Sequence, residues 1–155
     1  MNITIKRILL AEDSDRDTEL TLNALAHHNL VNEIERVRDG AEALDYLYRR
    51  GQFSSRPSGN PAVVLLDLKM PKMDGLEVLR QIRSDPQLEL IPVVVMTSSR
   101  EEQDVVRSYE LGANAYVVKP VKFNEFVDAV KQIGVFWAMI NQPPEVRAGV
   151  KPDPS

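Results

Sequence analysis

Residues 63–75 read Val63-Val64-Leu65-Leu66-Asp67-Leu68-Lys69-Met70-Pro71-Lys72-Met73-Asp74-Gly75, and they contain the strongest structural signal in the chain. The four apolar residues that open this stretch predict a parallel strand buried on both faces. Asp67 follows them directly. Ligands of open α/β sheets bind at the carboxyl ends of the strands. The Asp67 carboxylate is therefore expected to lie in a ligand-binding or reactive site.

Other apolar segments are also followed by residues with reactive or ligand-binding side chains. They are residues 7–11 before Glu12-Asp13, residues 93–96 before Thr97, and residues 115–118 before Lys119-Pro120. The carboxyl ends of parallel strands lie at one edge of a sheet, so these polar side chains are expected to converge with Asp67.

Hydrophobic periodicity along the chain alternates between strand and helix patterns. The predicted strands are residues 7–11, 34–37, 63–66, 91–96 and 115–118; the predicted helices are 15–28, 41–51, 74–85, 101–111 and one from 123. Residues 52–61 contain Ser, Gly, Asn and two prolines and predict a surface loop. The fold class is therefore α/β: a flavodoxin-like, doubly wound sheet of five parallel strands in the order 2-1-3-4-5, with five helices.

The composition narrows the class of protein. A chain of 155 residues with 43% hydrophobic and 27% charged residues is long enough for one soluble domain. Its net charge of −4 argues against non-specific binding of nucleic acid. The absence of cysteine excludes disulfides and thiol chemistry, and no apolar run is long enough to span a bilayer. With no signal-peptide pattern at the N-terminus, a cytoplasmic location is the simplest expectation.

The polar residues at the strand ends form a set that fits phosphoryl chemistry. Two carboxylates 4 Å apart repel by about 4 kcal/mol at an effective dielectric of 20, so Glu12, Asp13 and Asp67 together require a cation. Oxygen ligands of this kind suit Mg²⁺, which also favours a phosphate oxygen as a ligand. Thr97 and Lys119 supply a hydroxyl and a positive charge for anionic oxygens, so Asp67 is expected to attack phosphorus.

With these residues in place, the chain resembles the receiver domain of two-component response regulators over residues 4–140. The resemblance implies that Asp67 is the phosphoacceptor and that Mg²⁺ is bound by Glu12, Asp13, Asp67 and the main-chain carbonyl of Lys69. It implies further that Thr97 and Tyr116 are switch residues, that Lys119 contacts the phosphoryl group, and that the Lys119–Pro120 bond is cis. The 67–75 motif, the 52–61 loop and Phe136-Trp137 are similar to small regulators paired with phytochrome-type histidine kinases.

The expected function is that of a single-domain phosphorylation switch rather than an enzyme, apart from slow autodephosphorylation. A sensor histidine kinase, in this subfamily a phytochrome, would donate the phosphoryl group. The output would be a change in protein–protein contacts, a phosphoryl relay or a change in dimerisation. No residues remain for a DNA-binding output domain, since residues 141–155 are a proline-rich tail expected to be disordered. The apolar residues near the C-terminus cover the edge of the sheet, fold back onto the first strand or form a homodimer interface. The interface is favoured, with Phe136, Trp137 and Ile140 in it.

Three alternatives remain. A phosphatase with an aspartate nucleophile uses a similar set of residues but usually carries an acid two residues after the nucleophile, where this chain has Lys69. A flavodoxin-like cofactor binder needs a phosphate-binding loop where Glu12-Asp13 would repel phosphate. A phosphorylation-independent interaction module would not need the full set of acids, Thr97 and Lys119.

Overall fold

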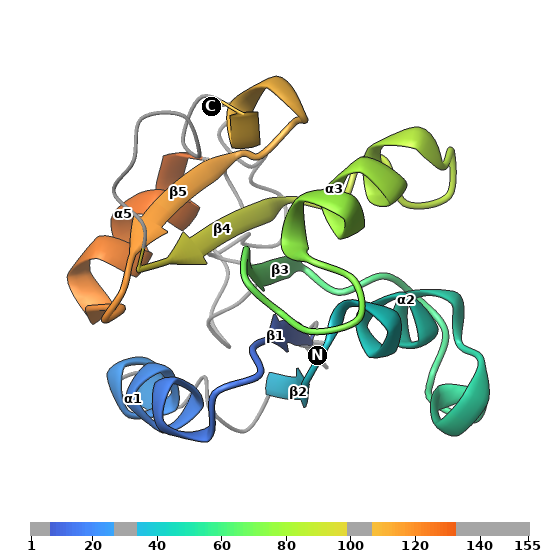
Figure 1. Ribbon diagram of the computed structural model, residues 1–155, viewed down its shortest axis with the longest axis horizontal. Coiled ribbons are helices and arrows are strands. Elements are labelled where there is room, and N and C mark those ends of the chain that lie inside the picture. The colour runs from blue at the N-terminus through green and yellow to red at the C-terminus, as the bar shows by residue number, and fades with distance from the viewer. Residues whose placement is uncertain (1–6, 27–33, 99–106, 133–155) are drawn as a thin grey trace, which may run out of the picture.

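The computed structural model describes residues 7–26, 34–98 and 107–132 (Figure 1). Strand β3 (Val63–Asp67) lies in the centre of the sheet, and all of its residues are buried. It pairs in parallel with β1 (Ile8–Ala11) on one side and β4 (Val93–Thr97) on the other. Burial on both faces explains why β3 is apolar at successive positions rather than at alternate ones.

The sheet is completed by β2 (Ile34–Val37) beside β1 and by β5 (Ala115–Val118) beside β4. All neighbouring strands are parallel, and the order β2-β1-β3-β4-β5 confirms the predicted topology. The chain reverses its direction of winding between β1 and β3. Ligands of such sheets bind outside the carboxyl ends of the strands at this switch point.

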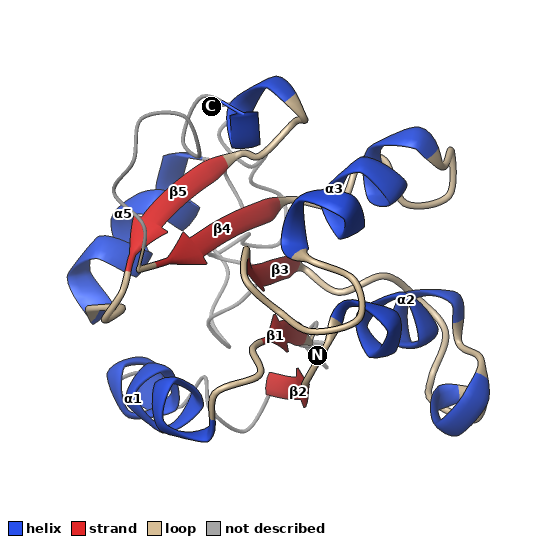
Figure 2. Cartoon of the chain, viewed as in Figure 1, coloured by secondary structure: helices blue, strands red, loops and turns tan. Residues whose placement is uncertain are grey.

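Helices cover both faces of the sheet, as Figures 1 and 2 show. One side carries α1 (Asp15–Leu25) and α5 (Phe123–Gln132), and the other carries α2 (Gly40–Tyr48) and α3 (Gly75–Ser84). Residues 107–110 are also helical and belong to the predicted helix 101–111, whose first six residues lie outside the described ranges. Side chains that accept a backbone N–H fix the start of three of these helices: Ser14 for α1, Asp39 for α2 and Asp74 for α3.

Two apolar cores lie on opposite faces of the sheet, because successive strand residues point to opposite sides. Leu9 and Leu66 pack with the buried residues of α2 and α3, among which Tyr46 is the largest fully buried side chain. Leu10 and Leu65 pack on the other face with residues of α1 and α5, including Phe126. The two cores hold the strands in register, and this fixes the positions of their carboxyl ends.

Several predicted boundaries were wrong by a few residues. The fourth strand begins at Val93 rather than residue 91 because Pro92 has no N–H to donate, and the Val93 N–H is bound by the Asn114 side chain. The second helix ends at Tyr48 rather than 51, since Arg49 takes the left-handed conformation with φ 55°. The described part of α1 ends at Leu25, and His28, its predicted end, lies outside the described residues.

The predicted 52–61 loop has internal order that the sequence did not reveal. Its first residues belong to a 3-10 turn, η3 (Gly51–Phe53), and Arg56 anchors the loop to the end of α2. The Arg56 guanidinium donates to the Tyr46 carbonyl at 2.7 Å and lies 4.2 Å from the centre of the Tyr46 ring. Arg56 therefore satisfies a carbonyl at the C-terminus of α2 and stacks on a core aromatic.

In the ranges that the structure describes, none of the helices has the length and apolar character required to cross a bilayer. The predicted tail, residues 141–155, lies outside those ranges.

Candidate functional site

Three carboxylates meet at the switch point, as the sequence predicted. Glu12 and Asp13 follow β1 directly, and Asp67 is the last residue of β3. Each contributes an oxygen to a group in which these atoms lie within 4.8 Å of one another. Glu12 has no exposed surface, Asp67 is 3% exposed, and Asp13 is exposed. The cluster therefore has a buried floor and an open, solvent-facing side.

Lys119 contacts the buried part of this cluster. The residue follows β5, and its Nζ donates to Glu12 Oε1 at 2.8 Å and to Asp67 Oδ2 at 3.1 Å. Its Nζ also donates to Asp17 Oδ2 at 2.8 Å, from the first turn of α1. The peptide bond between Lys119 and Pro120 is cis, as the resemblance implied.

Backbone N–H groups hold the second oxygen of each buried carboxylate. Ser14 N–H donates to Glu12 Oε2 at 3.2 Å, and Lys69 N–H donates to Asp67 Oδ1 at 3.2 Å. Each carboxylate is thus held between the Lys119 ammonium and the N–H two residues further along its own loop. These contacts fix both side chains in one orientation, which favours reaction at a defined oxygen.

The local environment perturbs the pKa of both partners. Burial raises the pKa of the Glu12 carboxyl from 4.5 to about 7; the hydrogen bond from Lys119 opposes this rise, and the neighbouring Asp67 carboxylate adds to it. Burial lowers the pKa of the Lys119 ammonium, but its hydrogen bonds to Asp17 and Glu12 and the charge of Asp67 outweigh that effect. The pKa of Lys119 therefore lies above its ordinary value, and the residue stays charged at neutral pH.

The loop that follows Asp67 packs without spare room. A Cβ on Gly75, the first residue of α3, would lie 2.2 Å from the Asp67 carbonyl oxygen. The Gly75 N–H donates to the Leu68 carbonyl at 2.9 Å. Gly40 lies equally close to the same loop, because a Cβ there would lie 2.1 Å from the Met73 carbonyl oxygen. Two glycines therefore permit the close approach that positions the loop after β3.

The main chain of Glu12 is held from the side of β2. Arg36 Nε donates to the Glu12 carbonyl at 2.8 Å. Arg36 and Arg38 also donate to Asp15 Oδ1, at 3.1 Å and 2.9 Å. These two hydrogen bonds hold the pKa of the Asp15 carboxyl below its ordinary value. Asp15 lies on the same helical turn as Asp17, but its carboxylate is paired with Arg36 and Arg38 rather than with Lys119.

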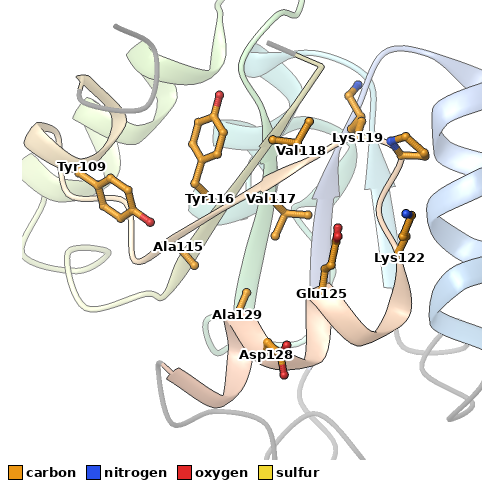
Figure 3. A pocket seen from close by; sticks show the side chains of 11 residues that line it. Tyr109, Ala115, Tyr116, Val117, Val118, Lys119, Lys122, Glu125, Asp128 and Ala129 are labelled. Carbon is orange, nitrogen blue, oxygen red and sulfur yellow. The ribbon is translucent and has the colours of Figure 1, made fainter. Parts of the chain in front are cut away.

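Thr97 lies on β4, the strand next to β3, and Tyr116 lies on β5, the strand beyond it at the edge of the sheet. Thr97 is the last residue of β4, opposite Val118 of β5, and its side chain lies outside what the structure describes. Tyr116 is partly buried against the core formed with α2 and α3. Figure 3 shows its ring on the opposite side of β5 from Val117 and α5. The predicted dimer residues Phe136, Trp137 and Ile140 lie outside the described residues.

Sequence reasoning missed one residue that the structure places at the site, Asp17. It was treated only as part of the first helix, although its carboxylate is one of the three partners of Lys119. An acid at this position in the first turn also suits the helix dipole, so the sequence alone gives no sign of a second role.

The donor set fits a hard divalent cation. Mg²⁺, Mn²⁺ and Ca²⁺ prefer carboxylate and carbonyl oxygens, and Mg²⁺ keeps several waters when it is bound by few carboxylates. The cluster offers three carboxylates within 4.8 Å and an open side at Asp13 for water or a phosphate oxygen. The chemistry and spacing of these oxygens suit such an ion better than a softer metal.

Comparison with known proteins connects this geometry to a family. The model of the response regulator receiver domain matches residues 8–131. Response regulator Rcp1 of Synechocystis sp. is 41% identical over 132 residues, which cover 85% of this chain and 88% of Rcp1. A solved structure of the Mn(2+)-bound form of Rcp1 superposes with a TM-score of 0.70 at 39% identity, covering 90% of this chain and 99% of that one.

Two other solved structures are regulators linked by name to phytochromes. Bacteriophytochrome response regulator RtBRR is 63% identical with a TM-score of 0.80, covering 91% of this chain and 85% of that one. The phosphorylated cyanobacterial phytochrome response regulator RcpA is 42% identical with a TM-score of 0.71, covering 86% of this chain and 94% of that one. On the evidence of the matched residues, the fold and these relatives, the chain belongs to the response regulator receiver family.

Proposed function

We propose that Asp67 accepts a phosphoryl group from a sensor histidine kinase. The observation that carries this proposal is the placement of the Asp67 carboxylate 3.1 Å from Lys119 Nζ, within the cluster that Glu12 and Asp13 complete. An oxygen of Asp67 attacks phosphorus of the phosphohistidine, the new P–O bond forms, and the P–N bond breaks. The electron pair of that bond returns to the imidazole of the kinase, and an acyl phosphate remains on Asp67.

The residues of the chain perform most of this reaction by position and charge. Lys119 supplies a fixed positive charge beside the attacking carboxylate, where negative charge gathers on the phosphoryl oxygens. Lys69 N–H orients Asp67 through Oδ1. Glu12, Asp13, Asp67 and the Lys69 carbonyl would hold Mg²⁺, which when bound neutralises charge on the incoming phosphoryl group.

The switch residues connect the site to the surface. A phosphoryl group on Asp67 adds nearly two negative charges beside the end of β4, whose last residue is Thr97. Tyr116 lies on β5, the strand next to β4, and a shift of Thr97 toward the phosphoryl group is proposed to be coupled to a movement of the Tyr116 ring. An open groove of about 390 Å³ lies along β5, and residues of β5 and α5 together with Tyr109 line it (Figure 3). Because β5 carries Tyr116, the surface formed by β5, α5 and Tyr109 is proposed as the output surface.

The family and its relatives support a choice of partners. The donor is a histidine kinase, and the similarity to regulators named for phytochromes supports a phytochrome-type kinase in this role. Transfer occurs in the cytoplasm, where such a kinase has ATP. The receiver domain comprises residues 4–140, residues 141–155 form a tail, and Phe136, Trp137 and Ile140 are proposed to form a homodimer interface.

A phosphatase that acts on small phosphoesters is not favoured. Lys69 stands where such enzymes usually carry a second acid, and its N–H is directed to Asp67 Oδ1. The family match and the relatives are regulators rather than phosphatases. The protein is therefore a phosphoacceptor whose turnover is limited to loss of its own phosphoryl group.

The experiment is to incubate the protein with acetyl phosphate, with Mg²⁺ or with EDTA, and to measure its intact mass. One phosphoryl adduct that requires Mg²⁺ and disappears in Asp67→Asn is expected. Asp74→Asn is the matched control, because Asp74 caps α3 nearby and makes no contact with Lys119 among the described residues. An adduct of equal yield in Asp67→Asn would contradict the proposal, and release of phosphate from many small phosphoesters would indicate the phosphatase.

A further inference from the structure

Among the residues that the structure describes, Lys119 has three carboxylate partners, and two of these three belong to the carboxylate cluster of Glu12, Asp13 and Asp67. Glu12 Oε1 and Asp67 Oδ2 accept from its Nζ at 2.8 Å and 3.1 Å, and both residues are in the three-carboxylate group. Asp17 Oδ2 accepts at 2.8 Å and stands outside that group. A cation that binds Glu12 and Asp67 therefore competes with the Lys119 ammonium for the same two carboxylates.

The local structure of α1 leaves the Asp17 carboxylate available for this contact. Ser14 caps the helix by accepting from Asp17 N–H at 3.1 Å. In a capping box the acid three residues after the cap would accept the N–H of the cap residue in return. Here the Ser14 N–H donates to Glu12 Oε2 instead, so the Asp17 carboxylate is directed to Lys119.

We propose that Asp17 is a positioning residue that retains the Lys119 ammonium at the site when a divalent cation takes over Glu12 and Asp67. The proposal rests on the proposed function only in so far as it requires that the cluster bind such a cation. Without Asp17, the ammonium would keep only the two partners for which the cation competes. The affinity for the cation would then fall, because each binding event would leave a poorly paired ammonium with 10% of its side chain exposed.

A purely structural role for Asp17 would be to place a negative charge at the N-terminus of α1. Asp15 provides the matched control for this alternative. It lies on the same turn and carries the same charge, but its carboxylate accepts from Arg36 and Arg38 rather than from Lys119. Asp15→Asn therefore removes the same formal charge from the same turn and leaves the three-way contact of Lys119 intact.

The test compares Asp17→Asn, Asp17→Glu and Asp15→Asn in the full chain. The first measurement is the exchange rate of the Lys119 ammonium protons by NMR without metal. The expected result is an increase of about two- to fivefold in Asp17→Asn, the factor of an interaction worth up to about 1 kcal/mol, with little change in Asp15→Asn. The second measurement is the Mg²⁺ dissociation constant by calorimetry, expected to rise by a similar factor in Asp17→Asn relative to Asp15→Asn. Asp17→Glu should restore part of both.

Equal Mg²⁺ affinity or equal ammonium exchange in Asp17→Asn and Asp15→Asn would overturn the proposal. If neither variant nor the parent protein binds Mg²⁺, the proposed function fails, and the role of Asp17 in retaining Lys119 against a cation fails with it. If Mg²⁺ binds and Asp67 takes up phosphoryl while the two variants behave alike, only the role of Asp17 is lost. The two failures are thus distinguishable.

Discussion

Replacing Lys119 with Met should destabilise the metal-free protein strongly. The substitution leaves Glu12, with no exposed side-chain surface, and Asp67, with 5% exposed, without the ammonium that bridges them. Removing one partner of a buried ion pair typically costs 3–5 kcal/mol. The site is open at Asp13, so the lower end applies, about 3 kcal/mol at pH 8. For a chain of this length, that corresponds to a fall in Tm of about 6–12 °C.

The loss should depend on pH in a defined direction. The folded pKa of Glu12 is raised from 4.5 to about 7, so its protonation stabilises the folded state below pH 4.5, and that contribution is lost as the pH rises through about 7. Lys119 lowers the pKa of Glu12 in the parent protein, so its removal raises that pKa further. Glu12 is then neutral over a wider range of pH, and the difference in unfolding free energy between the two proteins should be smaller at pH 5 than at pH 8.

The assay is urea unfolding of Lys119→Met and the parent protein from pH 5 to pH 8 with EDTA, repeated with Mg²⁺ at pH 8. Mg²⁺ should restore more stability to the variant than to the parent protein, since the ion finds the carboxylates free of the ammonium. Lys122→Met is the control, because Lys122 is an exposed lysine three residues further on. A variant as stable as the parent protein at pH 8 without metal would refute the account of Lys119 as the internal counterion of the cluster.

Three further predictions concern the metal, the loop after β3 and a structural arginine. Mg²⁺ affinity measured by calorimetry should rise as the pH increases through about 7, where Glu12 loses its proton; a flat profile would contradict this. Gly75→Ala should lower the free energy of unfolding by about 1–3 kcal/mol and slow phosphorylation of Asp67. The reason is that the added Cβ would lie 2.2 Å from the Asp67 carbonyl oxygen. Thermal unfolding at an unchanged temperature would contradict this prediction. Arg83→Met should lower stability by about 2–3 kcal/mol and leave Mg²⁺ affinity unchanged. Arg83 donates to the Gly112 carbonyl at 2.9 Å and the Ile91 carbonyl at 2.7 Å, which precede β5 and β4 and so lie at the opposite end of the strands from the site. Loss of Mg²⁺ binding in a folded variant would contradict it.

The sequence was sufficient for the sheet and for the carboxylates because both follow from local patterns. Apolar residues before Asp67 place it at the end of a buried strand, and parallel strands bring Glu12 and Lys119 to the same edge. The structure confirmed the strand order and the convergence of these residues.

What the sequence could not provide are contacts that depend on three-dimensional geometry. Asp17 is separated from Lys119 by about a hundred residues, and only the fold brings the first turn of α1 beside the loop that follows β5. Arg56 in the 52–61 loop also binds a carbonyl that becomes available only where α2 ends. The left-handed conformation of Arg49 ends that helix, and no residue pattern in the sequence predicted this conformation.

The central claim is that Asp67 carries the phosphoryl group, and the most direct measurement locates the modification itself. The protein is treated with acetyl phosphate and Mg²⁺, the acyl phosphate is reduced with borohydride, and the resulting peptides are sequenced by mass spectrometry. Reduction of an aspartyl phosphate leaves homoserine, so the account predicts homoserine at position 67. Homoserine at another aspartate such as Asp13 or Asp74, with unmodified Asp67, would contradict it.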